Sequence, residues 1–74
     1  MTRIKGFIIR IPEGKQFGFI KGEDNMDYFF HESAFQGDFQ EAARTYERDK
    51  IYVTFEGTKG QKGYRAENVV EVGE

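Results

Sequence analysis

Short runs of β-forming residues alternate with polar or glycine-rich turns along the whole chain. Apolar and aromatic residues gather in five such runs, at residues 5–11, 17–21, 27–31, 50–56 and 64–72. Isoleucine, valine, phenylalanine and tyrosine favour strands, whereas proline and glycine end them. The stretch 36–49 lacks strand character, and residues 40–44 within it favour a helix. The pattern therefore predicts five strands, with one longer and partly helical connection between the third and the fourth.

The length of the chain limits this pattern to a single domain, which we expect to span residues 1–74. A domain of this size buries only about 60% of its unfolded surface, so it holds one small core. In the run 50–56, Ile51, Val53 and Phe55 point to one side. The segment 57–63 reads as a flexible, basic loop. Five short strands with glycine-rich turns are typical of a small closed β-barrel, so the predicted fold class is all-β.

Two of the predicted strands are apolar on both faces. Side chains alternate along a strand, so the two phenylalanines of residues 17–20 share one face while the isoleucine lies on the other. In residues 28–31 one phenylalanine shares a face with the histidine, opposite a tyrosine and a second phenylalanine. A barrel has one inside. If Ile20, Tyr28 and Phe30 fill it, the side chains left outside are Phe17, Phe19, Phe29 and His31.

An exposed aromatic patch of this kind is unfavourable unless something binds it. Aromatic rings beside Lys or Arg suit unpaired bases, because the rings stack on bases and the cations neutralise phosphates. Three other arrangements remain open from the residues alone. Phe17 and Phe19 could form the core with Ile20 outside, Phe29 could lie under the connection 36–49, or a dimer could cover the patch.

The composition argues against a catalytic or metal site. The chain has eight Phe, four Tyr and no cysteine, which excludes disulfides, zinc–thiolate sites and a thiol nucleophile. His31 is the one histidine, so any metal site or catalytic triad has at most one imidazole. The glycines of 57–63 do not form a phosphate-binding GxxxxGK[ST] pattern. We expect no enzymatic activity, no cofactor and no small-molecule substrate.

The lengths of the apolar runs bear on the expected localisation of the protein. No run approaches the roughly 20 residues needed to span a bilayer. Residues 1–9 lack the sustained apolar stretch and small-residue cleavage site of a signal peptide. We therefore expect a cytoplasmic protein with no membrane partner.

Charge is unevenly distributed along the chain. Residues 1–22 carry five cationic residues and one acidic residue, whereas residues 23–56 carry nine acidic and three cationic residues. The net charge is −2, so the global basic signature of many nucleic-acid-binding proteins is missing. A local basic stripe in the first segment remains compatible with phosphate contacts, although uneven charge on a solvated surface is the plainer interpretation.

Two of these runs carry recognisable motifs. Residues 15–20, Lys-Gln-Phe-Gly-Phe-Ile, resemble the first RNA-binding motif of cold-shock domains, usually Lys-Gly-Phe-Gly-Phe-Ile. Residues 27–31, Asp-Tyr-Phe-Phe-His, resemble the second, usually Asp-Val-Phe-Val-His-Phe. Residues 60–69 are similar to the family's Gly-x-x-Gly-x-x-Ala-x-Asn-Val ending. The resemblance covers roughly residues 4–72, and two motifs in order with a matching ending form a specific signal.

The resemblance implies a five-stranded antiparallel OB-fold barrel of the cold-shock type, which binds single-stranded RNA or DNA on strands two and three. It implies base stacking by the four outward side chains and a backbone contact by a lysine. It also suggests an additional stacking ring after Gln-Gly and two lysines in a loop beside the face. Together with Arg10, which stands at a stacking position of the family, these expectations give the nucleic-acid-binding residues Lys15, Phe17, Phe19, Phe29, His31, Arg10, Phe39, Lys59 and Lys62.

The chain departs from the family pattern at several of these positions. Arg10 stands where the family usually has a stacking Trp, Ile11 replaces the next aromatic, and Glu32 replaces the Phe after the histidine. Lost rings weaken binding by about 1–3 kcal/mol per stacked base. Arg10 compensates in part, because a guanidinium plane stacks on bases and pairs with phosphates.

Two functions therefore compete at the level of sequence. The first is a module that binds single-stranded RNA or DNA, as a monomer, and serves as an RNA chaperone or a regulator of transcription or translation. The second is a barrel that acts mainly through protein–protein contacts, with a partner bound by the acidic segment 38–49 or by the altered face. Salt dependence separates the two, because phosphate contacts make log affinity fall steeply with log salt.

Overall fold

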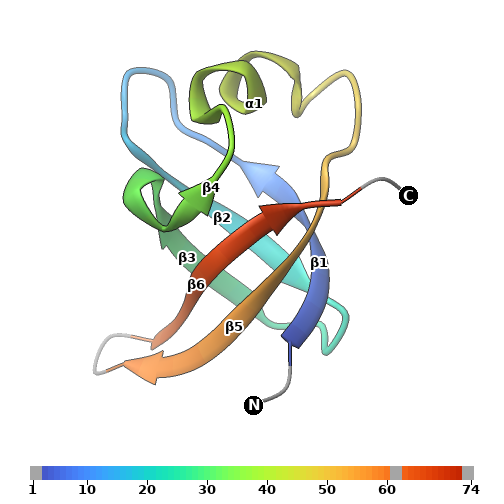
Figure 1. Ribbon diagram of the computed structural model, residues 1–74, viewed down its shortest axis with the longest axis vertical. Coiled ribbons are helices and arrows are strands. Elements are labelled where there is room, and N and C mark those ends of the chain that lie inside the picture. The colour runs from blue at the N-terminus through green and yellow to red at the C-terminus, as the bar shows by residue number, and fades with distance from the viewer. Residues whose placement is uncertain (1–2, 61–62, 73–74) are drawn as a thin grey trace.

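The computed structural model describes residues 3–60 and 63–72, and it is built almost entirely from strands. The elements follow one another along the chain as shown in Figure 1: β1 (Arg3–Arg10), β2 (Phe17–Gly22), β3 (Asp27–His31), the short 3₁₀ helix η1 (Glu32–Ala34), β4 (Phe35–Gln36), α1 (Phe39–Thr45), β5 (Tyr52–Gly60) and β6 (Gly63–Glu71).

The strands form one sheet that closes on itself. Its order is β3-β2-β1-β5-β6-β4, and an additional pairing of β3 with β6 closes the barrel. The pairs β1–β2, β2–β3, β1–β5 and β5–β6 are antiparallel. The closing pair is parallel, with Phe29 opposite Arg65. The expected five-stranded OB-fold barrel is therefore confirmed, although its closure is not antiparallel.

A short strand that the sequence pattern did not predict extends the sheet. β4 pairs in parallel with β6, where Phe35 lies opposite Val69. Phe35 follows η1 and is buried, so this strand fixes the start of the long connection against the barrel. The aromatic residue Phe35, shortly after β3, is the feature of the sequence that could have predicted this strand.

The core lies inside the barrel and follows the predicted strand phase. Its largest fully buried side chains are Phe30, Phe55, Ile20, Val53 and Val69. The alternation of residues 50–56 is confirmed, because Ile51, Val53 and Phe55 are all buried.

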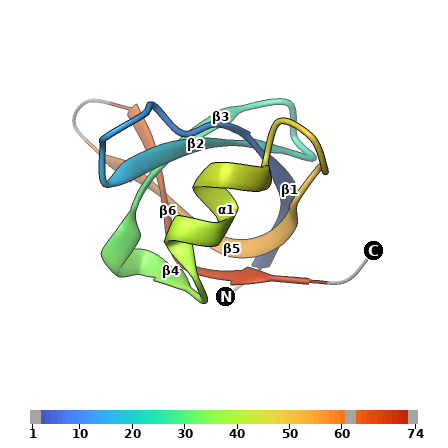
Figure 2. The same cartoon turned by 90° about the horizontal axis from the view of Figure 1, so that it is seen from above.

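The predicted helix forms and covers one end of the barrel. Asp38 caps α1 by accepting a hydrogen bond from the Glu41 backbone N–H at 3.1 Å. Arg44 pairs with Glu41 at 2.8 Å, an i,i+3 contact. Phe39 and Ala42 are its buried residues, so one side of the helix packs against the core of the barrel. Seen from above in Figure 2, α1 lies across the mouth formed by the strands.

The segment 57–60 is a strand, which corrects the prediction of a flexible loop. β5 continues to Gly60 and pairs with β6 down to the Gly60–Gly63 contact. The ladder of backbone hydrogen bonds outweighs the low strand propensity of the glycines here, because the two strands face each other over their full length. Within the described ranges, no helix is long and apolar enough to cross a membrane.

Candidate nucleic-acid interface

The register of β2 and β3 decides which aromatic side chains point outward. Phe17 lies opposite His31, and Phe19 lies opposite Phe29. Cross-strand partners share a face of the sheet. These four residues are partly exposed. We call the set formed by Phe17, Phe19, Phe29 and His31 the aromatic platform.

The opposite face of the same two strands is the floor of the core. Ile20 and Phe30 are 0% exposed and Tyr28 is 4% exposed. Ile20 lies opposite Tyr28 in the register, so the buried set is in phase across both strands. The alternative that Phe17 and Phe19 form the core is thereby excluded, and Phe29 is not sealed under the connection 36–49.

The three phenyl rings of the platform hold one another in place. The Phe17 and Phe29 ring centroids are 5.4 Å apart with the planes tilted by 34°. Phe19 meets both rings edge-on, at 6.1 Å from Phe17 and 6.0 Å from Phe29. Such contacts are favourable geometries for aromatic pairs and restrict the rotamers of all three. The three rings therefore form one packed cluster on the outer face of the sheet.

His31 is oriented by its own chain. Its Nδ1 accepts a hydrogen bond from the Ser33 backbone N–H at 3.1 Å, and Ser33 Oγ lies 3.0 Å from the same nitrogen. The acceptor role of Nδ1 leaves the hydrogen of the neutral ring on Nε2. The imidazole thus caps η1 and is fixed beside Phe17.

Gly18 explains why the two phenylalanines of β2 are separated by a residue without a side chain. A Cβ at this position would lie 2.8 Å from Phe30 Cε1 and 2.9 Å from the Arg10 carbonyl oxygen. Both distances are shorter than real Cβ contacts. The close approach of β1 and the buried Phe30 ring therefore requires glycine on the inner side of β2.

Arg10 lies beside the platform, as expected from the sequence. It is exposed and lies opposite Phe19 in the β1–β2 register, just after a bulge at Ile9. The guanidinium thus starts from the strand next to an exposed ring, where it can pair with a phosphate or stack on a base.

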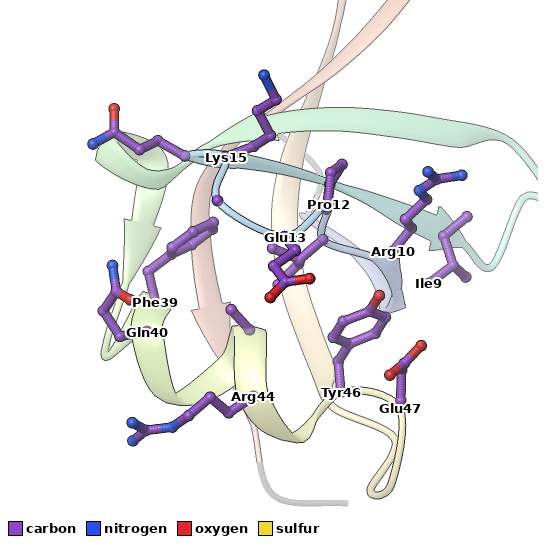
Figure 3. Close-up of a pocket in the computed structure, with 14 residues that line it drawn as sticks. Ile9, Arg10, Pro12, Glu13, Lys15, Phe39, Gln40, Arg44, Tyr46 and Glu47 are labelled. Carbon is purple, nitrogen blue, oxygen red and sulfur yellow. The ribbon is translucent and has the colours of Figure 1, made fainter.

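Lys15 is exposed and comes directly before the platform strand. Its backbone N–H closes the β1–β2 turn by donating to the Pro12 carbonyl oxygen at 3.1 Å. Figure 3 shows Lys15 and Arg10 on the strand side of a polar hollow between this turn and α1. On the helix side, the hollow is lined by Gln40, Arg44, Tyr46 and Glu47.

Arg65 is a platform neighbour that sequence reasoning missed. It is exposed and lies opposite Phe29 where β3 and β6 close the barrel. One row across the sheet therefore reads Arg10, Phe19, Phe29, Arg65. Alternation with the buried Ala66 indicates that Arg65 points outward. The sequence of β6 alone does not show that Arg65 lies opposite Phe29 in the pairing that closes the barrel.

One expected residue lies away from the platform, and another is not described by the structure. Lys59 lies in β5 opposite Tyr64, on the other face of the β5–β6 ribbon from Arg65. Lys62 lies outside the described residues.

Phe39 is a core residue, so its assignment to the interface is wrong. Its side chain is 6% exposed, and its ring lies 6.0 Å from Phe30 and 6.1 Å from Phe35. The cause is α1, which begins at this residue and turns the ring into the barrel mouth. The spacing from Gln-Gly did not show that a helix would start here.

Acidic side chains lie beside the aromatic platform and reduce its positive charge. Lys21 pairs with Asp27 at 3.1 Å at the edge next to Phe19 and Phe29. Glu32 follows His31 and is partly exposed. Arg65 lies 3.7 Å from a Glu67 carboxylate oxygen, so the face is cationic mainly at Arg10 and Lys15, with Glu32 beside the histidine.

The closed barrel and its outward aromatic strands define an OB-fold protein of the nucleic-acid-binding class. The sequence profile of the 'Cold-shock' DNA-binding domain matches residues 4–72. The chain belongs to this family, and membership supports nucleic-acid binding.

Two similar relatives cover nearly the whole chain. Cold shock-like protein CspE of Buchnera aphidicola subsp. Acyrthosiphon pisum is 40% identical over 74 residues, which are 97% of this chain and 100% of the relative. Cold shock-like protein CspE of Escherichia coli K12 is 41% identical over 71 residues, or 95% of this chain and 97% of the relative.

Proposed function

We propose that this protein binds single-stranded RNA or DNA by stacking unpaired bases on the aromatic platform. The observation that carries the proposal is the difference in burial across β2 and β3. The platform side chains are partly exposed and in mutual contact, while their sequence neighbours fill the core.

The cations around the platform fit the phosphates of such a strand. Arg10 and Arg65 stand at the two ends of the Phe19–Phe29 row, and Lys15 precedes Phe17. Each stacked base contributes about 1–3 kcal/mol, and the cations add a salt-dependent attraction. Because stacking does not read base edges, binding tolerates many sequences.

The same geometry supports a role as an RNA chaperone or a regulator of transcription or translation. A base stacked on the platform is unavailable for a hairpin, so binding shifts the equilibrium toward the unpaired strand without ATP. The protein acts in this scheme as a monomer, because one barrel carries the whole platform.

A protein partner is the second candidate, and the polar hollow beside α1 favours it. The hollow mixes both charges, with Glu13 and Glu47 beside Arg10 and Arg44. Mixed charge is less suited to a polyanion than to a folded protein surface. In this case the segment 38–49 carries the contact, and affinity responds weakly to salt.

The experiment is a fluorescence-anisotropy titration of a labelled oligo-pyrimidine with the wild type and the Phe17→Ala/Phe29→Ala double variant. Two lost stacking partners cost about 2–6 kcal/mol, so we expect binding to fall below detection for the variant. Circular dichroism should show an intact fold, because both rings lie outside the core.

The control is the Met26→Ala/Val70→Ala variant, which removes two exposed apolar side chains outside the platform. It should bind like the wild type. Equal affinity of the wild type and the platform double variant would exclude stacking on these rings.

A further inference from the structure

A second aromatic pair lies on the outer surface, on strands that neighbour the platform. Phe7 in β1 lies opposite Tyr52 in β5. Their ring centroids are 6.4 Å apart and the planes meet at 64°. Phe7 is partly exposed and Tyr52 is 40% exposed, and neither belongs to the buried core cluster. The platform does not use this pair.

The pair forms part of an open groove with a basic rim. The groove runs over the outer face of β1 and is lined by Lys5, Phe7, Lys21 and Tyr52, with Glu23 as its acidic lining residue. Lys50 adds a third cation, because its Nζ lies 4.4 Å from the Phe7 ring centroid. Aromatic rings surrounded by lysines again match the chemistry of bases and phosphates.

The groove is continuous with the platform. Phe7 lies opposite Lys21 in β2, and Phe19 lies two residues earlier on the same face of that strand. Phe7 and Phe19 are therefore diagonal neighbours across the β1–β2 pair, which places their side chains about 7–8 Å apart. β1 itself lies between β2 and β5 in the sheet (Figure 1). A chain that leaves the platform across Lys21 reaches the groove without crossing the core.

We propose that this groove binds a further one or two nucleotides of the same single strand, with a base on Tyr52 or Phe7 and phosphates near Lys5 and Lys21. This proposal rests on the function proposed above. Charge favours a nucleic acid over a protein here, because Lys5, Lys21 and Lys50 outnumber Glu23 and Asp27, the carboxylate that pairs with Lys21 at 3.1 Å. The groove also adjoins the platform, so a nucleic-acid strand bound on the platform is already held close to it.

The test is the dependence of affinity on oligonucleotide length. Labelled oligo-thymidylates of about four to ten nucleotides, within the usual range for one OB fold, are titrated in an anisotropy assay. The wild type is compared with Tyr52→Ala, Phe7→Ala and Tyr52→Phe. Statistical gains from extra binding registers on long strands are common to all four proteins, so they cancel when variants are compared at one length.

We expect all four proteins to bind the shortest strands equally. With longer strands, the wild type and Tyr52→Phe should gain affinity, whereas Tyr52→Ala and Phe7→Ala should bind roughly 5- to 100-fold more weakly. Tyr52→Ala is decisive if Phe7→Ala unfolds, because the tyrosine side chain is exposed.

Each remaining outcome has a distinct meaning. Identical length dependence in all variants, with tight binding of the shortest strand, overturns the groove and leaves the platform standing. No binding of any strand by the wild type overturns the proposed function, and the groove with it. A change in sedimentation of Tyr52→Ala without a change in length dependence assigns the groove to a second copy of the chain and overturns the proposal.

Discussion

The two faces of the β2–β3 pair carry similar residues and differ in burial. Phe29 and Phe30 are adjacent in the sequence, yet Phe30 is fully buried while Phe29 is partly exposed. The inner-face side chains are buried in the barrel core, whereas the outer face keeps three partly exposed rings in contact with one another. Strand phase, and not residue type, therefore decides whether a phenylalanine of these two strands lies in the core or on the surface.

The polar surroundings of the two faces differ as well. Arginines stand at both ends of the outer Phe19–Phe29 row. On the inner face, the polar atom of Tyr28 reaches the surface and donates to Asp24 Oδ2 at 2.6 Å. The outer face thus presents exposed arginines at its rim, of which Arg65 also pairs with Glu67 at 3.7 Å, while the Tyr28 hydroxyl of the inner face bonds within the chain.

The largest expected effect comes from truncating neighbouring rings on opposite faces. Phe30→Ala removes a fully buried ring and should cost about 3–5 kcal/mol in the free energy of unfolding, a large share of the stability of a domain this small. Phe29→Ala should cost only about 1 kcal/mol, the scale of aromatic pair contacts. Urea denaturation followed by circular dichroism measures both losses, and equal losses would contradict the difference in burial between the two faces.

Gly18→Ala tests how closely β1 and the Phe30 ring approach the inner side of β2. The added methyl would meet the Phe30 ring and the Arg10 carbonyl oxygen below 3.0 Å. We expect a loss of about 1–3 kcal/mol in the free energy of unfolding, because β1 must move. A thermal-unfolding scan reads this out. Gly14→Ala serves as a comparison for backbone strain, since that glycine has φ +77° but nothing within 4 Å of the added methyl. An unchanged midpoint for Gly18→Ala would show that the inner side of β2 has spare room.

The buried tyrosine predicts a pH effect that the outer rings lack. The hydrogen bond to Asp24, followed by burial, raises the pKa of Tyr28 to about 12, and the same bond lowers the pKa of Asp24. A raised pKa means that the folded state holds the proton more tightly than the unfolded chain, whose tyrosines titrate near about 10. The resulting stability is complete below about pH 10 and is lost as the pH rises through about 12.

Tyr28→Phe removes this contribution. It should cost about 1 kcal/mol at neutral pH and flatten the decline in stability between about pH 10 and 12. The lowered pKa of Asp24 acts at the other end, where its contribution disappears as the pH falls through the acidic range. Urea midpoints measured across these pH values compare the two proteins, and superimposable profiles would contradict the role of the hydrogen bond.

A smaller effect concerns the salt dependence of binding. If Lys15 contacts a phosphate, Lys15→Gln should reduce the slope of log affinity against log salt by about 0.7 for a single strand. Arg48→Gln is the matched control, because it makes the same change in charge at an exposed position after α1. Anisotropy titrations at several salt concentrations give the slopes. A reduced slope in the control alone would move the anionic contact to the segment 38–49.

The sequence was sufficient for most of the barrel. The inward set of β5 follows from strict alternation, the bounds of β3 follow from a run of aromatic residues, and the helix follows from the helix formers of residues 40–44. Alternation along the strands, with Ile20, Tyr28 and Phe30 inside, predicted the outward set of Phe17, Phe19, Phe29 and His31. These features are local, so each is encoded in a few consecutive residues.

The features that sequence reasoning missed depend on contacts between distant parts of the chain. Arg65 joins the platform through the parallel closure of β3 on β6, and Tyr52 meets Phe7 through the β1–β5 register. Phe39 follows a motif that suggests stacking, but the start of α1 places its ring against Phe30. Register and helix placement decide these three cases, and neither is visible in a single strand.

An NMR titration of the aromatic and backbone signals with a short oligo-pyrimidine shows directly where a single strand binds. We expect the largest shifts at Phe17, Phe19, Phe29 and His31, with smaller ones at Arg10 and Arg65, and the least change at the buried rings of Phe35 and Phe39. Shifts concentrated on α1 and the hollow beside it, or no shifts on the β2–β3 face, would contradict this expectation.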